Sequence, residues 1–437
     1  MTYPFMSPPN AARFVLSNAT VPAVTLDGFQ GATSEGLAKA DIVVADGLIK
    51  DVLPAGSAPT ELAKADMKEG MVWPTFVDMH THLDKGHIWE RRSNPDGSFP
   101  GALEAVKADR EANWSAADVK KRMEFSLRSA YAHGTSLIRT HLDSLDPQHR
   151  ISFEVFNELR EAWKDRIALQ AVSLFPLDFM ADDVYFADLL AVVRDAGGLM
   201  GGVTQMNPDL DRQLDKLIRA SAENGLDIDL HVDESKQKEV FTLKAIAEAV
   251  LRNTFEGKVT VGHCCSLARQ DEDVARATID LVAKAGISVV SLPMCNMYLQ
   301  DREANRTPRW RGVTLFHELA AAGVTTAVAS DNTRDPFYAY GDLDPVEVFR
   351  EAVRILHLDH PLDTAARVVT TSPAATLGRP DIGRIAAGGP ADLVLFSARR
   401  WSEFLSRPQS DRVVLRKGKM IDRSLPDYRE LDTVVGA

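Results

Sequence analysis

The most informative stretch of the chain is Phe76-Val77-Asp78-Met79-His80-Thr81-His82-Leu83-Asp84-Lys85, which ends an apolar run with two histidines two positions apart. Side chains of a β-strand alternate between its faces, so both imidazoles would point to one side, where one metal ion can bind them. In a chain with 11 histidines, two ordinary surface or core residues at this spacing are the alternative. The rest of the chain decides between these interpretations.

Seven further strand-like runs follow, separated by segments of helical periodicity at a spacing near the ~30 residues of a βα unit. These runs are 136–143, 167–174, 199–204, 226–233, 259–263, 287–292 and 325–331. Eight alternating β and α units predict a TIM-like (β/α)8 barrel, an α/β fold that carries its active site at the carboxyl ends of the strands. An open, doubly wound sheet is the alternative, because the count alone does not prove closure.

The two ends of the chain differ from the middle, because both contain short β-like segments separated by turn residues. These segments are 12–18, 41–46 and 47–53 near the start, and 391–396 and 411–416 near the end. We therefore expect residues 1–70 and 380–437 to form one small β-sandwich domain, and residues 71–379 to form the barrel. The connection over 86–114 is unusually long, which is typical of a lid but also of a plain surface loop.

The composition is that of an ordinary globular protein, with 45% hydrophobic and 26% charged residues among 437. The formal net charge of −12 argues against nucleic acid or an anionic membrane as a partner, since these attract basic surfaces. No apolar stretch approaches the ~18 residues of a membrane span, and the first residues lack the pattern of a secretory signal. We therefore expect a cytoplasmic protein, for which a homo-oligomer is compatible with the sequence.

Polar side chains gather at the ends of five predicted strands, where a barrel places its active site. They are His80 and His82, His141 and Asp143, His231 and Glu234, His263, and Asp331. Imidazole and carboxylate are ligands of divalent metals, and a bound metal lowers the pKa of a water toward ~7. The expected metal ligands are His80, His82, His231 and Asp331.

Glu234 and His263 are the expected catalytic partners of that site. Glu234 lies beyond the end of its strand, where it can carry protons to and from the water. His263 can orient the hydroxide or stabilise developing charge, and a hydrogen-bonded core histidine beside Cys264 is the alternative. For His141 and Asp143 we expect a supporting contact or a structural polar pair.

On these motifs the chain resembles the amidohydrolase superfamily, and within it the cytosine deaminase family. His80-Thr81-His82-Leu83-Asp84 is similar to the family's first metal motif, and His231-Val232-Asp233-Glu234 to its His-x-Asp-Glu. Gly262-His263 is similar to its sixth-strand histidine, and Ser330-Asp331-Asn332 to its eighth-strand aspartate. Segments 296–302 and 335–338 also resemble the family. The resemblance extends from the first β segments to 388–394.

The resemblance implies a hydrolase acting on C–N bonds, an aminohydrolase of pyrimidine metabolism that releases ammonia from a cytosine-like six-membered nitrogen heterocycle. It implies one divalent metal ion, Fe(II) or Zn(II), because residues 201–205 lack the lysine that carries a bridging carbamate in binuclear relatives. In the implied reaction, a metal-bound hydroxide attacks the amine-bearing carbon while Glu234 passes a proton to the adjacent ring nitrogen. Asp331 then helps to move a proton to the leaving nitrogen.

Four positions are candidate substrate contacts, and they are Leu177, Gln205, Asn332 and Phe337. Leu177 stands where cytosine deaminases carry a glutamine that hydrogen-bonds the pyrimidine, and losing such a bond can change the preferred substrate. Asn332 and Phe337 replace a common aspartate and tryptophan, and Gln205 can supply the missing amide. An N-substituted triazine or a cyclic ureide or lactam is therefore the alternative substrate, and a non-catalytic metal-binding barrel is a further alternative.

Overall fold

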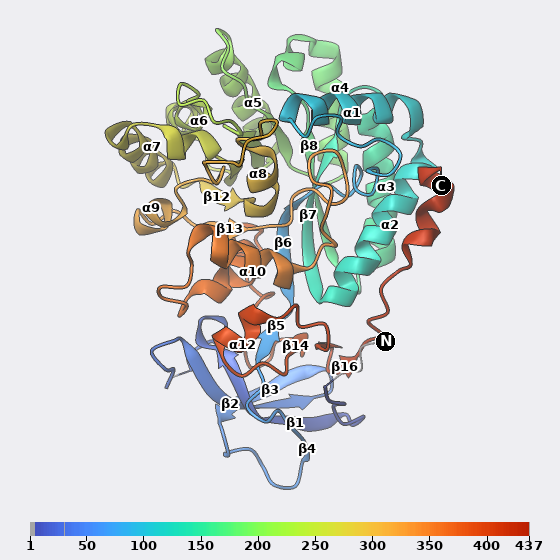
Figure 1. The fold of residues 1–437 in the computed structure, drawn as a ribbon, viewed down its shortest axis with the longest axis vertical. Helices are drawn as coiled ribbons and strands as arrows, with labels where there is room; N and C mark the ends of the chain where they lie inside the picture. The colour runs from blue at the N-terminus through green and yellow to red at the C-terminus, as the bar shows by residue number, and fades with distance from the viewer. Residues whose placement is uncertain (1–4, 30, 437) are drawn as a thin grey trace. The chain divides into compact units, whose positions relative to one another are not determined.

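The structure is a computed structural model and describes residues 5–29 and 31–436 (Figure 1). The chain divides into two compact units. One contains the residues up to Val77 together with Ser129–Leu137 and Asp344–Leu425. The other contains Asp78–Arg128, Ile138–Leu343 and the residues from Pro426 on. The predicted domain boundaries at 70/71 and 379/380 stay a prediction.

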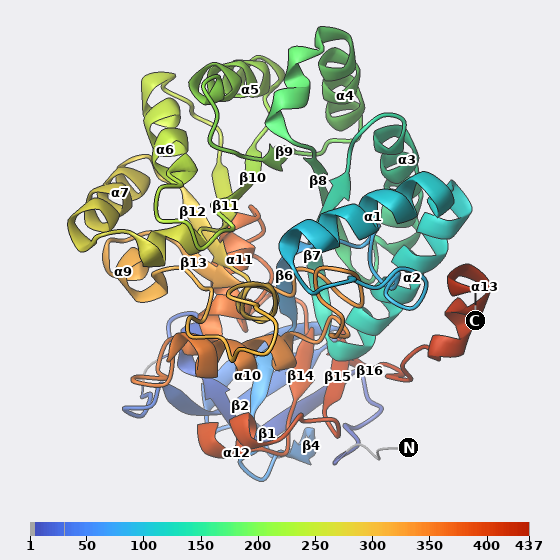
Figure 2. The ribbon, with the colours of Figure 1, turned by 45° about the horizontal axis from the view of Figure 1, so that its top comes forward.

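Eight strands form a closed barrel, as the sequence predicts (Figure 2). Strands β6 to β8 form one sheet and β9 to β13 another, and isolated parallel bridges join the two sheets at both edges. The bridges are Val172–Leu199 and Pro176–Val203 between β8 and β9, and Thr81–Asp331 between the ends of β6 and β13. The strands are β6 Phe76–Thr81, β7 Thr135–Asp143, β8 Ala168–Leu174, β9 Met200–Val203, β10 Ile228–Val232, β11 Val259–His263, β12 Ser288–Ser291 and β13 Thr326–Val328.

Helices surround the strands of the barrel, and Figure 2 shows α3 to α7 outside β8 to β12. Helix α5 illustrates the cause, because its buried residues Leu210, Leu214, Leu217, Ile218 and Ser221 recur at helical spacing. It ends at Gly225, whose φ of +63° is a left-handed conformation that glycine adopts without strain. The helices are α2 Ala116–His133, α3 Gln148–Trp163, α4 Asp183–Asp195, α5 Leu210–Asn224, α6 Thr242–Arg252, α7 Glu272–Lys284, α8 Pro293–Leu299, α9 Phe316–Ala321 and α13 Asp432–Val435.

The long connection over 86–114 contains a helix, α1 (Phe99–Asn113). Ser98 begins it as N-cap and accepts a hydrogen bond from the backbone N–H of Gly101. Buried residues on one side of α1 include Ala102, Ala105 and Val106. The connection is therefore largely ordered secondary structure rather than an extended loop.

Segments from the N-terminal and C-terminal parts of the chain, up to Val77 and over Asp344–Leu425, build the β-sheet unit, as the sequence predicts, and Figure 1 shows their strands side by side. One sheet has the order β3-β2-β1-β4 and the other β16-β15-β14-β5. Phe14 and Leu16 of the first sheet share a core with Leu393 and Leu415 of the second. The strands are β1 Arg13–Pro22, β2 Leu37–Ala45, β3 Leu48–Pro54, β4 Ala63–Asp66, β5 Val72–Pro74, β14 Leu393–Leu395, β15 Val413–Arg416 and β16 Lys419–Met420, and the unit also holds α10 Pro345–Leu356, α11 Thr371–Thr376 and α12 Trp401–Ser406.

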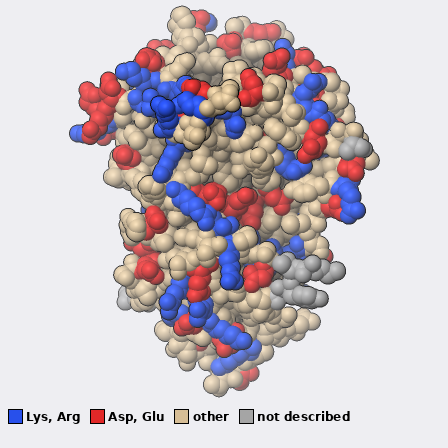
Figure 3. Space-filling model, in the orientation of Figure 1, with Lys and Arg blue, Asp and Glu red and all other residues tan. Residues whose placement is uncertain are grey.

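The surface carries both signs of charge. In Figure 3, basic and acidic side chains lie next to one another across most of the face in view. Exposed pairs of this kind, such as Arg399 and Glu403 at 2.7 Å, each contribute little to stability. Within the residues that the structure describes, no helix has the length and apolar character needed to cross a lipid bilayer.

Candidate metal centre and active site

The four predicted metal ligands lie together at the carboxyl ends of β6, β10 and β13. The Nε2 atom of His231 lies 3.2 Å from the Nε2 of His80 and 3.2 Å from the Nε2 of His82. The Oδ1 atom of Asp331 lies 3.3 Å from the Nε2 of His82 and 3.7 Å from the Nε2 of His80. Three nitrogens and one oxygen therefore face a common centre.

This geometry fits a single divalent metal ion. Four tetrahedral ligands at about 2.1 Å from a metal stand about 3.4 Å apart, which matches the spacings of these four atoms. Burial lowers the pKa of His80, His82 and His231 well below the ordinary value, so the rings are neutral. Neutral imidazole is the form that binds a metal.

Barrel closure places Asp331 beside the two histidines of β6. Its backbone N–H donates to the carbonyl of His80 at 2.9 Å, and the hydroxyl of Thr81 donates to the carbonyl of Asp331 at 2.8 Å. Asp331 has a φ of +64°, a left-handed conformation that costs free energy in a residue other than glycine. The contacts with β6 hold this conformation, so that the carboxylate completes the ligand set.

Glu234 and His263 lie beside this centre, as the strand-end pattern predicts. The Oε1 atom of Glu234 lies 3.5 Å from the Nδ1 of His263. Burial, and next the charge of Asp331, raise the pKa of Glu234 well above its ordinary value. A carboxyl group whose pKa is raised toward neutrality is suited to accept a proton and return it.

Asn296 is a polar partner of both residues that the sequence did not single out. Its side-chain Nδ2 donates to Oε1 of Glu234 at 3.2 Å and lies 2.9 Å from Nδ1 of His263. Asn296 comes from α8, the helix that follows β12, and is fully buried.

A cavity of about 500 Å³ opens beside the ligand set. Its lining includes three of the four candidate substrate contacts, Gln205, Asn332 and Phe337. The described residues that line it do not include the fourth, Leu177, which begins a 3-10 helix and is 2% exposed. Leu177 packs against Gly202, where an added Cβ would lie 2.7 Å from its Cδ2. The structure therefore brings Leu174, Phe175 and Pro176 to the cavity, but not Leu177.

Lys85 and helix α1 are parts of the cavity wall that were not predicted from the sequence. Lys85 is 5% exposed, and its ammonium lies 4.6 Å from the centre of the Phe337 ring. A charged residue directly after the first metal motif was the signal for it. One face of α1 also lines the cavity, with Phe99, Leu103, Val106, Lys107 and Arg110. The spacing of these five residues is helical and was visible in the sequence.

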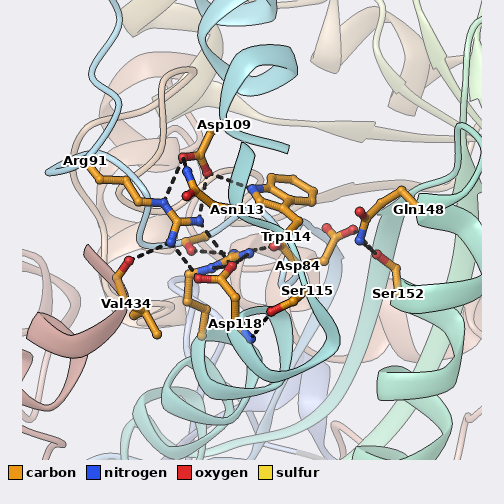
Figure 4. Close-up of polar contacts among 12 residues, drawn as sticks. Asp84, Arg91, Asp109, Asn113, Trp114, Ser115, Asp118, Gln148, Ser152 and Val434 are labelled. Atoms are coloured by element: carbon orange, nitrogen blue, oxygen red, sulfur yellow. Dashed lines mark hydrogen bonds and ion pairs between the residues drawn. The ribbon is translucent and has the colours of Figure 1, made fainter. Parts of the chain in front are cut away.

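A buried polar network holds the turn that carries Lys85 (Figure 4). Arg122 donates hydrogen bonds to the backbone carbonyls of Asp84 and Gly86, on either side of Lys85. Asp118 accepts hydrogen bonds from Arg122, at 2.7 Å, and from Arg91, at 2.6 Å.

Arg91 extends this network in two directions. It forms a two-bond pair with Asp109, with both distances 2.8 Å, and Asp109 also accepts a hydrogen bond from Trp114. Arg91 also donates a hydrogen bond to the backbone carbonyl of Val434 at 2.7 Å. This bond attaches the C-terminal residues beside α2 (Figures 1 and 2).

His141 and Asp143 take different places. The His141 ring lies 4.0 Å from the His80 ring, and its Nε2 lies 3.8 Å from Asp229, which Arg139 binds at 2.8 Å. Asp143 lines the cavity and pairs with Arg110 at 2.7 Å. His141 therefore lies behind a metal ligand, whereas Asp143 is part of a charged pair at the cavity.

Comparisons with known proteins agree with this fold. In a solved structure, the 5-methylcytosine deaminase from Klebsiella pneumoniae liganded with 5-fluorocytosine superposes with a TM-score of 0.80 at 22% identity, covering 95% of this chain and 98% of that chain. The N-isopropylammelide isopropylaminohydrolase from Burkholderia multivorans superposes with a TM-score of 0.72 at 23% identity, covering 94% and 98% of the two chains. At these identities the likeness shows the fold.

Sequence comparisons identify the family. The chain is 86% identical to a pterin deaminase of Rhizobium rhizogenes strain K84 over 437 residues, covering all of both chains. It is 27% identical to the N-isopropylammelide isopropyl amidohydrolase of Pseudomonas sp. strain ADP over 371 residues, 82% of this chain and 86% of that relative. The model of the amidohydrolase family matches residues 141–422. The resemblance predicted from the motifs is confirmed: the chain is a hydrolase acting on C–N bonds, and it belongs to the amidohydrolase family.

Proposed function

We propose that the protein is a metal-dependent deaminase of pterin-class heterocycles, which replaces the amino group of an aminopyrimidine ring by oxygen and releases ammonia. The observation that carries the proposal is the cavity in which Glu234 and three of the metal ligands face aromatic and apolar side chains. The 86% identity to a pterin deaminase supports the substrate class. A pterin retains the six-membered ring predicted from the sequence and fuses it to a second ring.

The cavity suits a flat bicyclic substrate. Its volume of about 500 Å³ lies within the ~300–1,000 Å³ of sites that bury drug-sized ligands. Phe99 and Phe337, whose ring centroids lie 5.5 Å apart, both line it, as do Phe175 and Val203. Aromatic and branched side chains bind the faces of such rings.

Polar side chains at the cavity can recognise the edge of the ring. The ammonium of Lys85 is a donor for a ring oxo group, and the amides of Gln205 and Asn332 offer both donors and acceptors. Asn332 itself donates to Oδ1 of Asp331 at 3.0 Å, which fixes its amide beside the ligand set. The proposed substrate contacts are therefore Gln205, Asn332 and Phe337, which the sequence predicted, together with Lys85 and without Leu177.

Glu234 and Asp331 each carry out one part of the proton transfer. His80, His82, His231 and Asp331 would hold a divalent metal, Fe(II) or Zn(II), and a metal bound there would lower the pKa of the attacking water toward ~7. Glu234 accepts a proton from that water and passes it to the ring nitrogen beside the amine-bearing carbon. Asp331, whose pKa burial raises to about 6, then moves the second proton of the water from the attacking oxygen to the amine nitrogen. The C–N bond breaks, the oxygen becomes the oxo group of the product, and ammonia departs.

The test is an assay of purified, metal-loaded protein with pterin, following ammonia and the product mass. The proposal expects one ammonia per product in which oxygen replaces the amino group, and ammonia release about 10²- to 10⁴-fold slower from Glu234→Gln with its metal still bound. Pterin left unchanged by the fully loaded wild-type protein contradicts the substrate class.

The same assay separates the alternative substrates. Cytosine tests the monocyclic substrate predicted from the sequence. An N-alkylated triazine tests the substrate class of the 27% identical relative, and its hydrolysis releases an alkylamine instead of ammonia. Opening a cyclic ureide or lactam adds water without releasing ammonia.

A cytoplasmic location, a homo-oligomeric state, a place in pyrimidine metabolism and the action of residues 86–114 as a lid stay predictions.

A further inference from the structure

The amide of Asn296 joins the two residues proposed to act on the attacking water. A single nitrogen, Nδ2, lies 3.2 Å from Oε1 of Glu234 and 2.9 Å from Nδ1 of His263. The backbone of Asn296 is fixed in α8, because its N–H donates to Leu292 at 2.9 Å and its carbonyl accepts from Gln300 at 2.8 Å. One rigidly held amide therefore contacts both side chains.

The charge of Glu234 determines which end of the amide faces it. An ionised carboxylate only accepts hydrogen bonds, so the group beside it must be the amide NH2 and not the amide oxygen. Glu234 is ionised in the state that receives a proton. The same NH2 group faces Nδ1 of His263 and offers that atom only a hydrogen.

The hydrogen of His263 must then be on its other ring nitrogen. A neutral imidazole that accepts at Nδ1 carries its hydrogen on Nε2. Nε2 is buried and has no partner among the described residues, and His263 lines the cavity.

We propose that Asn296 is a positioning residue that fixes His263 as the Nε2–H tautomer. His263 then donates a hydrogen bond to the oxygen that attacks the ring, and Glu234 alone accepts protons. The proposal rests on the proposed function for the roles of Glu234 and His263, whereas the tautomer itself follows from the contacts of Asn296.

The tautomer has a second consequence for the metal centre. His263 forms, with His80 and His231, a group of ligand atoms that lie within 4.8 Å of one another and could hold an ion. A nitrogen that carries a hydrogen has no lone pair for a metal. Asn296 therefore also keeps His263 out of the ligand set, which leaves the metal with the four ligands already described.

Nitrogen NMR of histidine-labelled, Zn(II)-loaded protein tests this assignment without substrate. The His263 signals are identified by their loss in His263→Gln. We expect a protonated Nε2 and an unprotonated Nδ1 in the wild-type protein. In Asn296→Asp the new carboxylate accepts from Nδ1, so that nitrogen should become protonated. A wild-type spectrum with the hydrogen on Nδ1 overturns the proposal, even if the variant does not fold.

Kinetics give the second measurement. Losing one preorganised donor to the reacting oxygen lowers kcat by about 10²- to 10³-fold, so we expect this loss in Asn296→Asp with KM little changed. Gln300→Ala is the matched control, because Gln300 lies just beyond α8 and its side-chain amide donates to the backbone carbonyl of Glu234, at 3.3 Å, rather than to its carboxylate. It should keep the wild-type His263 spectrum. Unchanged kcat in Asn296→Asp with intact metal overturns the positioning role, whereas a wild-type protein inactive on pterin counts against the proposed function alone.

Discussion

The backbone N–H of Asp331 donates to the carbonyl of His80 at 2.9 Å, and the carboxylate of the same aspartate lies 3.7 Å from the Nε2 of the same histidine. One pair of residues therefore closes the barrel between β6 and β13 and supplies half of the proposed ligand set. Metal binding and closure of the barrel are linked through this pair, which has consequences for stability.

Removing the metal should lower the melting temperature by several degrees. A ligand that binds only the native state stabilises it by about 4 kcal/mol when its free concentration is 1,000 times its Kd. Differential scanning calorimetry of chelated and Zn(II)-reloaded protein measures the change. His82→Asn removes one ligand, so its melting temperature should respond less to Zn(II). Equal melting temperatures for the chelated and reloaded wild-type protein would contradict the link.

Replacing Glu234 by Gln should lower kcat by about 10²- to 10⁴-fold, the range for loss of a positioned general acid–base group. The amide keeps the size of the side chain but cannot take up the proton of the water. Metal content and KM should stay near those of the wild type. Glu248→Gln is a matched control, since Glu248 lies on α6 with a side chain that is 42% exposed and pairs with Lys244 at 2.6 Å. Full activity of Glu234→Gln would refute the proposed proton transfer.

The meeting of the four proposed metal ligands was predictable from the sequence because their placement follows from local rules. The period of two puts His80 and His82 on one side of a strand, and the ends of barrel strands put His231 and Asp331 near them. These rules need no knowledge of side-chain packing. They predicted which residues meet, and the structure adds the spacing that fits one metal ion.

The side chain that contacts both Glu234 and His263 was not predictable in the same way. Asn296 lies 62 residues from Glu234 and 33 from His263, and only the packing of the short helix α8 turns its amide toward both. Leu177 is the opposite case, a predicted contact that does not line the cavity. A 3-10 helix after Pro176 turns its side chain onto Gly202 and away from the cavity. The place of Leu177 in the family motif predicted a substrate contact, whereas the local backbone directs its side chain toward Gly202.

Asp344 should make the stability of the protein dependent on pH on the acid side. Burial alone would raise the pKa of Asp344, but the charges of Arg412 and His133 and the hydrogen bonds to the carboxylate together outweigh burial and hold that pKa well below its ordinary range. The pair contributes fully to the free energy of unfolding above the ordinary aspartate pKa of about 3.9, and this contribution is lost as the pH falls from there through the lowered pKa. Arg412 donates two hydrogen bonds to Asp344, at 2.7 and 2.6 Å.

Urea unfolding of Asp344→Asn at pH 7 and at about pH 2.5, which lies below the ordinary aspartate pKa, tests this interaction. Because the Arg412 side chain is only 2% exposed, leaving it without a counter-charge should cost about 3–5 kcal/mol at pH 7. The variant should also lose less stability than the wild type on going to acid pH. Asp27→Asn removes an exposed partner of Arg384 and should leave both values unchanged. A wild-type pH dependence in Asp344→Asn would show that other groups cause it.

Lys85→Met should lower kcat/KM for pterin by about 10- to 100-fold, the equivalent of the ~1.5–3 kcal/mol of a hydrogen bond to a charged group. Methionine keeps the length of the side chain and its contact with Phe337 but has no donor for a ring oxo group. Steady-state kinetics measure the change. Lys107→Met is the control, because Lys107 lines the same cavity with a side chain that is 68% exposed. Equal losses in both variants would point to the net charge of the cavity rather than to a bond from Lys85.

Arg122→Lys should raise KM and lower the melting temperature, because one ammonium cannot replace a planar guanidinium that binds Asp118 and two backbone carbonyls together. The turn that carries Lys85 would then lose its support, while Glu234 and the metal ligands keep their places, so kcat should change little. Arg128→Lys is the matched control on the same helix, since Arg128 is exposed and pairs with the exposed Glu430, an interaction worth little. Kinetics and calorimetry of both variants measure the difference. If Arg122→Lys loses thermal stability but binds pterin with the wild-type KM, Arg122 supports the fold and does not position Lys85.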